Sequence, residues 1–74
     1  MKRNVKAERV CLEMLIINFG KVRTDVWLRY MRFERTVGEP KNVSKLYDNA
    51  LATLNKELLE DFLSLHNLFI NGVL

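Results

Sequence analysis

Residues 25–36 read DVWLRYMRFERT, and this stretch decides the fold class of the chain. Its large apolar side chains recur every three to four residues, at Trp27, Tyr30, Met31 and Phe33. This spacing places them on one face of an α-helix, which is stable when that face packs against other elements. The stretch therefore predicts an amphipathic helix that packs among other helices.

The same spacing predicts three further helices, over about residues 5–19, 40–54 and 57–70. Gly20 follows the first, where a left-handed cap suits a residue without a Cβ atom. Gly38 ends the second helix, and Pro40 fits the first position of the third, where no amide hydrogen is needed. Short connections favour antiparallel hairpins. We therefore predict an all-α fold of about four helices.

The two halves of the chain match when the sequence is shifted by 35 residues. Apolar positions then coincide as Leu12 with Tyr47, Leu15 with Ala50, Ile16 with Leu51, Phe19 with Leu54, Trp27 with Phe62, Leu28 with Leu63, Tyr30 with Leu65, and Phe33 with Leu68. Chance explains part of such agreement, because a helical pattern has few registers. The turn also falls in register, which favours a genuine helix–turn–helix repeat that stacks as an α–α solenoid.

Charge is unevenly divided along the chain. Residues 1–35 carry nine basic and four acidic side chains, whereas residues 36–74 carry three basic and five acidic ones. A basic half joined to an acidic half indicates head-to-tail packing with neighbours, or an anionic partner at one end. Two basic ridges could contact RNA or a partner, although such ridges are usually solvated. They comprise Arg29, Arg32 and Arg35, and Lys2, Lys6 and Arg9.

The sequence holds one cysteine, Cys11, and one histidine, His66. Cys11 has apolar neighbours and no nearby thiol or histidine, so we expect a reduced, buried side chain that binds no metal. His66 lies in mid-helix beside leucines, which is typical of a structural histidine. No catalytic motif and no phosphate-binding glycine loop is present. We predict a non-enzymatic protein without a cofactor or bound metal.

The first residues loosely imitate a targeting signal, because Lys2 and Arg3 precede the apolar run VCLEMLIINF. Glu13 interrupts that run, no cleavage site of small residues follows it, and it is too short to cross a bilayer. We therefore expect no membrane association. A membrane-surface helix over Lys2–Phe19 is a minor alternative.

The run WLRYMRFE at 27–34 resembles the W-x-x-Y-x-x-F-E signature of the first helix in a half-a-tetratricopeptide (HAT) repeat. The run VSKLYDNAL at 43–51 is similar to the second helix of that repeat, with Tyr47, Ala50 and Leu51 at motif positions. The resemblance implies a solenoid fragment: a second helix over 1–20, a central repeat over 24–55, and the first helix of a degenerate repeat over 56–74.

HAT repeats occur mainly in eukaryotic RNA-processing proteins. The likeness is to the C-terminal part of HAT proteins of the small-subunit processome, which implies a nuclear and nucleolar protein–protein scaffold for ribosomal RNA processing. The expected partners are other proteins of a pre-ribosomal or RNA-processing complex, with weak or indirect RNA contact. Alternatives are a scaffold of splicing or messenger 3′-end complexes, and a basic helical module that binds RNA directly. An isolated fragment would expose apolar surface and self-associate.

The resemblance also implies roles for the motif residues. Trp27, Tyr30 and Phe33 share one stripe of one helix, so we expect them to pack in the core rather than to stack on RNA bases. Tyr47 is expected to pack from the facing helix. Glu34 is either a partly buried carboxylate that pairs with a basic side chain or caps a loop, or a solvated side chain.

Overall fold

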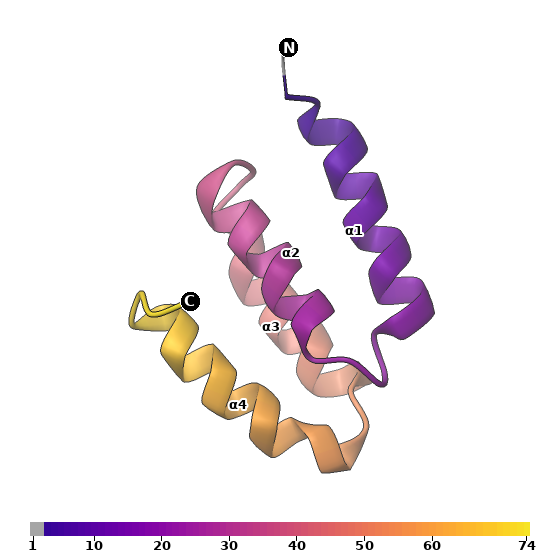
Figure 1. Ribbon diagram of the computed structural model, residues 1–74, viewed down its shortest axis with the longest axis vertical. Helices are drawn as coiled ribbons and strands as arrows, with labels where there is room; N and C mark the ends of the chain where they lie inside the picture. Colours follow the sequence, from indigo (N-terminus) through magenta and orange to yellow (C-terminus); the bar gives the residue numbers. More distant parts are fainter. Residues whose placement is uncertain (1–2) are drawn as a thin grey trace.

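Four helices form the regular secondary structure of residues 3–74, the part of the chain that the computed structural model describes. They are α1 (Val5–Phe19), α2 (Asp25–Thr36), α3 (Asn42–Thr53) and α4 (Lys56–Ile70). Helix α2 is central and packs against the other three (Figure 1). In that view α1 lies on one side of α2, α4 lies on the other, and α3 lies behind. The predicted all-α class with four helices is confirmed.

The helix boundaries follow the prediction closely. Helices α1 and α2 begin and end at the expected residues. Helix α3 begins at Asn42 instead of Pro40, which lies in the preceding turn and accepts a hydrogen bond from the amide of Val43 at 3.1 Å. Helix α4 begins at Lys56, one residue earlier than expected.

The turns of the two expected hairpins differ in length. Residues 20–24 connect α1 to α2, but only residues 54–55 connect α3 to α4. Helix α2 begins at residue 25 and helix α4 at residue 56, which gives an offset of 31 instead of 35. The prediction that the turns share one register is therefore wrong. The amide of Asn55 donates to the carbonyl of Lys21 at 2.9 Å, so both turns meet at the same end of the molecule.

Burial also differs between the positions paired by the 35-residue shift. Trp27 and Phe62 are both buried. Phe33 is buried, whereas its counterpart Leu68 is 40% exposed. The hydrophobic core draws on all four helices and consists of Leu12, Val26, Trp27, Tyr30, Met31, Phe33, Leu46, Ala50, Leu54, Phe62 and Phe69.

Trp27 of α2 packs against the C-terminal end of α1. Its side chain is 2% exposed, and its indole Nε1 donates to the carbonyl oxygen of Gly20 at 2.7 Å. Gly20 has φ −60°, so the prediction of a left-handed cap is wrong. A Cβ atom there would collide with the carbonyl oxygen of Ile16 and lie 3.2 Å from Cζ2 of Trp27. The glycine is needed chiefly because its backbone approaches the Ile16 carbonyl closely, with the indole ring also near, and not for a positive φ.

Helix α1 buries less of its surface than its sequence suggested. Leu12 is buried, and Leu15 and Ile16 are half-buried. Cys11 and Phe19 are exposed, so the prediction of a buried thiol is wrong. The physical reason is that α1 packs chiefly against one neighbour, α2, which covers a single strip of its surface.

Replacing Trp27 tests the importance of this contact. Trp27→Ala should lower the free energy of unfolding by about 3–5 kcal/mol, because it leaves a cavity. Trp27→Phe should cost about 1–2 kcal/mol, since a ring remains but the hydrogen bond to Gly20 is lost. Urea unfolding followed by circular dichroism measures both values. Ile17→Ala is the control, because Ile17 is 74% exposed; a Trp27→Ala protein as stable as this control would contradict the expectation.

Candidate functional site

The aromatic side chains of α2 are core residues. Trp27, Tyr30 and Phe33 are 2%, 7% and 6% exposed, and the rings of Tyr30 and Phe33 meet edge to face at 6.4 Å between centroids. The predicted core role is therefore confirmed. The alternative in which these three rings stack on RNA bases is wrong, because too little ring surface is open to a base.

The motif residues of α3 also pack inward. Ala50 is fully buried, and Tyr47 and Leu51 are half-buried. The ring of Tyr47 lies 4.1 Å from the ring of His66 and 6.0 Å from that of Phe62, between centroids. Tyr47 therefore fills the space between α3 and α4, as expected of a packing residue.

Glu34 is a buried carboxylate, 1% exposed, that joins three other segments of the chain. Nη2 of Arg9 in α1 donates to its Oε1 at 2.9 Å. The amide of Glu39, in the turn after α2, donates to the same oxygen at 3.3 Å, and Nδ2 of Asn42 in α3 donates to Oε2 at 2.8 Å. Of the two interpretations left open by the sequence, the paired and buried carboxylate is confirmed.

These contacts decide the charge of Glu34. Burial by itself raises the pKa of the carboxyl, but the hydrogen bonds from Arg9, Asn42 and the Glu39 amide outweigh it, so that the pKa lies below its ordinary value. The carboxylate in turn raises the pKa of the Arg9 guanidinium. Glu34 and Arg9 therefore form an ion pair that links α2 to α1.

Gly38 makes room for this carboxylate. A Cβ atom at residue 38 would collide with Oε1 of Glu34 and lie 2.9 Å from Nη2 of Arg9. The glycine that ends α2 in the sequence pattern is thus also part of the packing around the ion pair.

Tyr30 forms a second polar link between α1 and α2. Its hydroxyl donates to Oε1 of Glu13 at 3.2 Å. Burial, together with the nearby carboxylate of Glu13, raises the pKa of Tyr30 to about 12. The hydroxyl therefore stays protonated and serves as a donor at neutral pH.

The predicted basic ridges do not remain intact as contact surfaces. Arg9 is occupied by Glu34. Arg35 is half-buried, stacks over the ring of Phe69 at 3.8 Å to the centroid, and donates to the carbonyl of Phe69 at 2.7 Å and to that of Leu74 at 2.9 Å. The prediction that these two arginines are free for RNA or a partner is therefore wrong, because both hold helices together.

The other predicted basic residues lie at the surface. Lys6, Arg29 and Arg32 are exposed. Arg29 approaches the carboxylate of Asp25 at 3.8 Å, with 61% of its side chain open to solvent. Lys2 lies outside the described residues. Arg29 and Arg32 are thus the members of the α2 ridge that remain available to a partner.

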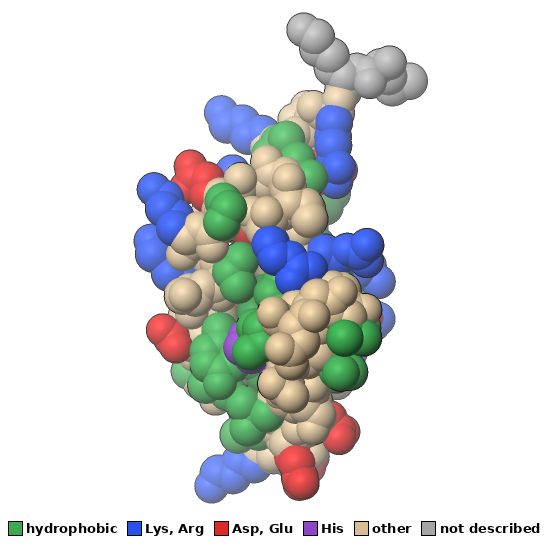
Figure 2. Space-filling view, turned by 90° about the vertical axis from the view of Figure 1, so that its left-hand side faces the viewer, with side chains coloured by type: hydrophobic (Ala, Val, Ile, Leu, Met, Phe, Trp, Pro, Cys, Tyr) green, Lys and Arg blue, Asp and Glu red, His purple; other side chains and the backbone are tan. Residues whose placement is uncertain are grey.

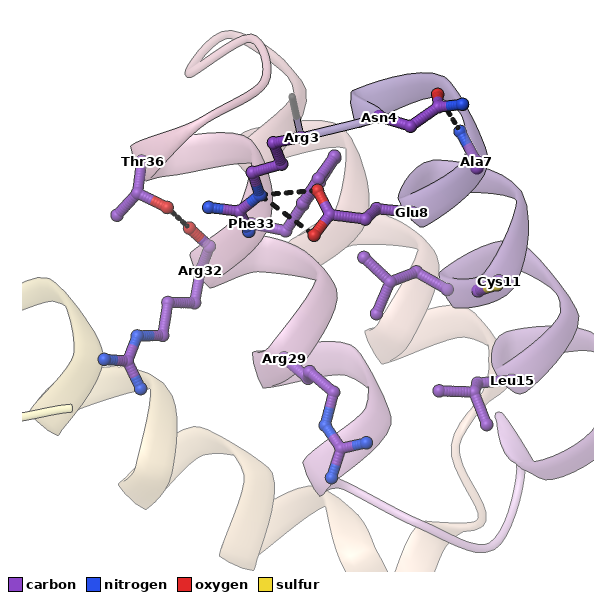
Figure 3. A pocket seen from close by; sticks show the side chains of 11 residues that line it. Arg3, Asn4, Ala7, Glu8, Cys11, Leu15, Arg29, Arg32, Phe33 and Thr36 are labelled. Carbon is purple, nitrogen blue, oxygen red and sulfur yellow. Dashed lines mark hydrogen bonds and ion pairs between the residues drawn. The ribbon is translucent and has the colours of Figure 1, made fainter. Parts of the chain in front are cut away.

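A groove of about 770 Å³ lies between α1 and α2. Figure 3 shows Cys11 and Leu15 of α1 on one side of the groove, with Phe33, Arg29 and Arg32 of α2 on the other side. At one end Nε of Arg3 donates to both carboxylate oxygens of Glu8 (2.9 and 2.7 Å), which places this ion pair over the groove. Sequence reasoning missed the groove, because it expected Cys11 and its neighbours to be covered by another helix.

The groove combines an apolar floor with a cationic rim. Leu12, Leu15 and Phe33 line the floor together with Cys11. Arg29 and Arg32 stand on the rim, and Arg32 forms no ion pair with any residue from 3 to 74. Such a surface suits apolar side chains flanked by carboxylates.

No metal centre is found within residues 3–74, where no group of three or more His, Cys, Asp or Glu side chains could hold an ion. None of the helices in this range is long and apolar enough to cross a membrane. No protein-family model, curated protein or solved structure matches the chain.

The Glu34 contacts give a prediction about stability. Glu34→Gln should lower the free energy of unfolding by about 2 kcal/mol, because the charged hydrogen bond to Arg9 is lost. Gly38→Ala should destabilise the chain as well, since the added Cβ displaces the same carboxylate. The matched control is Glu39→Gln, whose carboxylate pairs with Lys41 at the surface.

The pH dependence of that loss follows from the lowered pKa of Glu34. The carboxylate contributes fully above the pKa of an unfolded glutamate, and its contribution disappears as the pH falls through the folded-state pKa. Urea titrations at several pH values should therefore show the difference between wild type and Glu34→Gln shrinking in acid. A difference that is constant with pH would contradict the assignment.

His66 gives a second pH prediction. Burial lowers the pKa of its imidazole below the ordinary 6.5, so the folded chain favours the neutral ring. Its stability contribution is complete above that ordinary value and declines as the pH falls below it. Thermal melts between pH 7.5 and pH 5 should show wild type losing more stability than His66→Phe, which keeps a ring between Tyr47 and Phe69. Parallel losses in the two proteins would refute this expectation.

Proposed function

We propose that the chain is part of a HAT-type helical-repeat scaffold that binds other proteins of an RNA-processing complex. The proposal rests on the resemblance of 27–34 and 43–51 to the two helices of a HAT repeat. It is supported by the packing of the motif side chains, since Trp27, Tyr30 and Phe33 are buried. It is also supported by the position of α2, which packs against a helix on each side as a repeat unit within a solenoid would.

The observation that carries the binding role is the groove between α1 and α2. Its apolar floor accepts one or two apolar side chains of a partner, and Arg29 and Arg32 on its rim pair with carboxylates beside them. The partner segment is thus an acidic, amphipathic stretch of another protein. Binding of this kind needs no cofactor and no chemical step.

The complex that the resemblance favours is the small-subunit processome, and the corresponding location is the nucleolus. A splicing complex or a messenger 3′-end complex is the alternative within the same family. Each of these assemblies contains many proteins, so the identity of the proteins that bind this chain distinguishes them.

Direct RNA binding is the second candidate, and one observation favours it. Arg29 and Arg32 are exposed side chains one helical turn apart on α2. They could contact neighbouring phosphates. Two cations alone give weak binding. The third arginine of this ridge, Arg35, is occupied, and so is Arg9 of the other ridge, since both hold helices together.

The test uses Cys11, the single cysteine of the sequence, which is exposed in the groove. A photocrosslinker attached to this thiol should capture proteins of the processome from nucleolar extract, before and after treatment with ribonuclease. Leu15→Glu in the groove should lower the yield about tenfold, because it places a charge on the apolar floor.

The matched control for Leu15→Glu is Ala52→Glu, which adds the same charge at an exposed site on α3. Capture of splicing proteins instead would point to the alternative complex. Capture that disappears with ribonuclease would favour direct RNA binding. Equal yields from Leu15→Glu and Ala52→Glu would refute the groove as the docking site.

A further inference from the structure

Helix α4 ends in a turn that contains the pair Asn71-Gly72. The amide of Gly72 donates to the carbonyl of Phe69 at 3.1 Å, and the amide of Val73 donates to that of Leu68 at 2.9 Å. With Gly72 at φ +78°, these bonds form a common glycine-terminated end of an α-helix. Asn71 and Gly72 are both exposed, on the side of the molecule that Figure 2 faces. The end of α4 therefore places an asparagine directly before a glycine at the surface.

An asparagine that precedes a glycine can react with the main chain. After losing its proton, the glycine nitrogen can attack the side-chain carbonyl carbon of the asparagine, because glycine has no Cβ atom to shield that nitrogen. Of the seven asparagines in the sequence, Asn71 is the one that precedes a glycine. The six that precede a residue with a Cβ atom are Asn4, Asn18, Asn42, Asn49, Asn55 and Asn67. No atom of residues 3–74 lies within 4 Å of the position that a Cβ atom of Gly72 would take, so the space beside the nitrogen is open.

We propose that Asn71 is a site of spontaneous deamidation, with water as the co-reactant. A bond forms between the nitrogen of Gly72 and Cγ of Asn71, the bond from Cγ to Nδ2 breaks, and ammonia leaves. The product is a five-membered succinimide ring. Water then opens the ring at one of its two carbonyls. Opening at Cγ gives aspartate, and opening at the main-chain carbonyl gives isoaspartate, in which the main chain runs through the former side chain.

Hydrogen bonds hold both reacting groups in the folded chain. The amide of Gly72 is bonded to the carbonyl of Phe69, as described above. Nδ2 of Asn71 donates to the carbonyl of Asn67 at 2.9 Å. The nitrogen of Gly72 has to leave its acceptor before it can lose its proton and attack. The reaction therefore requires local opening of the turn, which is a partial unfolding of the helix end.

Arg35 of α2 opposes this opening. Its Nη1 donates to the carbonyl of Phe69 at 2.7 Å, and its Nη2 donates to the carbonyl of Leu74 at 2.9 Å. One guanidinium thus joins the residues before and after the Asn71-Gly72 pair. It also lies 3.8 Å from the centroid of the Phe69 ring. Arg35 therefore keeps the turn closed and slows the reaction.

The modification changes the contacts of the turn. Either product replaces the side-chain amide of Asn71 by a carboxylate, so the donor to the carbonyl of Asn67 is lost. The negative charge lies at the C-terminal end of α4, where the helix dipole disfavours it. Isoaspartate also lengthens the main chain between the two carbonyls that Arg35 joins. Deamidation therefore releases the turn from α2. This site lies outside the α1–α2 groove, and the proposal does not depend on the scaffold function.

The experiment incubates the full chain in neutral buffer and follows each asparagine by mass spectrometry of proteolytic peptides. Asn71 should deamidate at least about tenfold faster than any other asparagine of the folded chain. Peptide standards that contain aspartate or isoaspartate identify the two products. Asn71→Gln is the matched control and should give no product at this position, since its longer side chain would have to close a six-membered ring. A rate at Asn71 no higher than at the other asparagines would overturn the proposal.

The role of Arg35 is tested in two ways. Wild type in urea, where the turn is open, should deamidate at Asn71 faster than folded wild type, and equal rates would refute control by the fold. Arg35→Lys should raise the rate in the folded chain by about tenfold, because an ammonium group lacks the planar fork that joins two carbonyls. Circular dichroism establishes that this variant is folded. Arg23→Lys, in the turn before α2, is the matched control; equal rates for the two variants would contradict the role of Arg35.

Discussion

The buried carboxylate of Glu34 is the interaction on which the arrangement of the helices depends. A lone charge in this position would cost several kcal/mol, so the fold is possible only where donors surround it. Arg9, the Glu39 amide and Asn42 supply them from α1, from the turn after α2 and from α3. Gly38 leaves the space that the carboxylate occupies. One side chain thereby fixes the position of three segments around α2, and apolar packing fills the volume that they enclose.

Helix α1 determines which surfaces are open. Three strips along α1 are apolar. The strip at Leu12 is covered by α2, the strip at Cys11 and Leu15 lines the groove, and the strip at Met14 faces outward. Helix α3 has a single apolar side and buries it against α2 and α4. Helix α1 therefore leaves large apolar side chains exposed, whereas α3 exposes none.

Helix positions were predictable because apolar spacing, glycines and the proline all agree on them. The width of the buried side of α1 was not predictable, because its apolar residues extend beyond the strip that α2 covers, and Cys11 was misplaced for this reason. The role of Gly20 was misinterpreted because glycine is favoured both where φ is positive and where other atoms come too close for a Cβ atom, and only the second holds here. The contact of Arg35 with Phe69 joins residues 34 positions apart, so the pattern of neighbouring residues in the sequence does not predict it. Likewise, the sequence left open whether Glu34 is buried, because the spacing of residues along the chain does not identify Arg9 as its partner.

The hydrogen bond between the amide of Asn55 and the carbonyl of Lys21 has a mechanical consequence. It holds the two inter-helix turns together at one end of the molecule, next to the indole of Trp27 on Gly20. The groove reaches towards the opposite end, where the ion pair of Arg3 and Glu8 lies across it. Near that end the ion pair of Arg9 and Glu34 joins the beginning of α1 to the last turn of α2. Both ends of the groove are thus clamped, so its width is set before any guest enters.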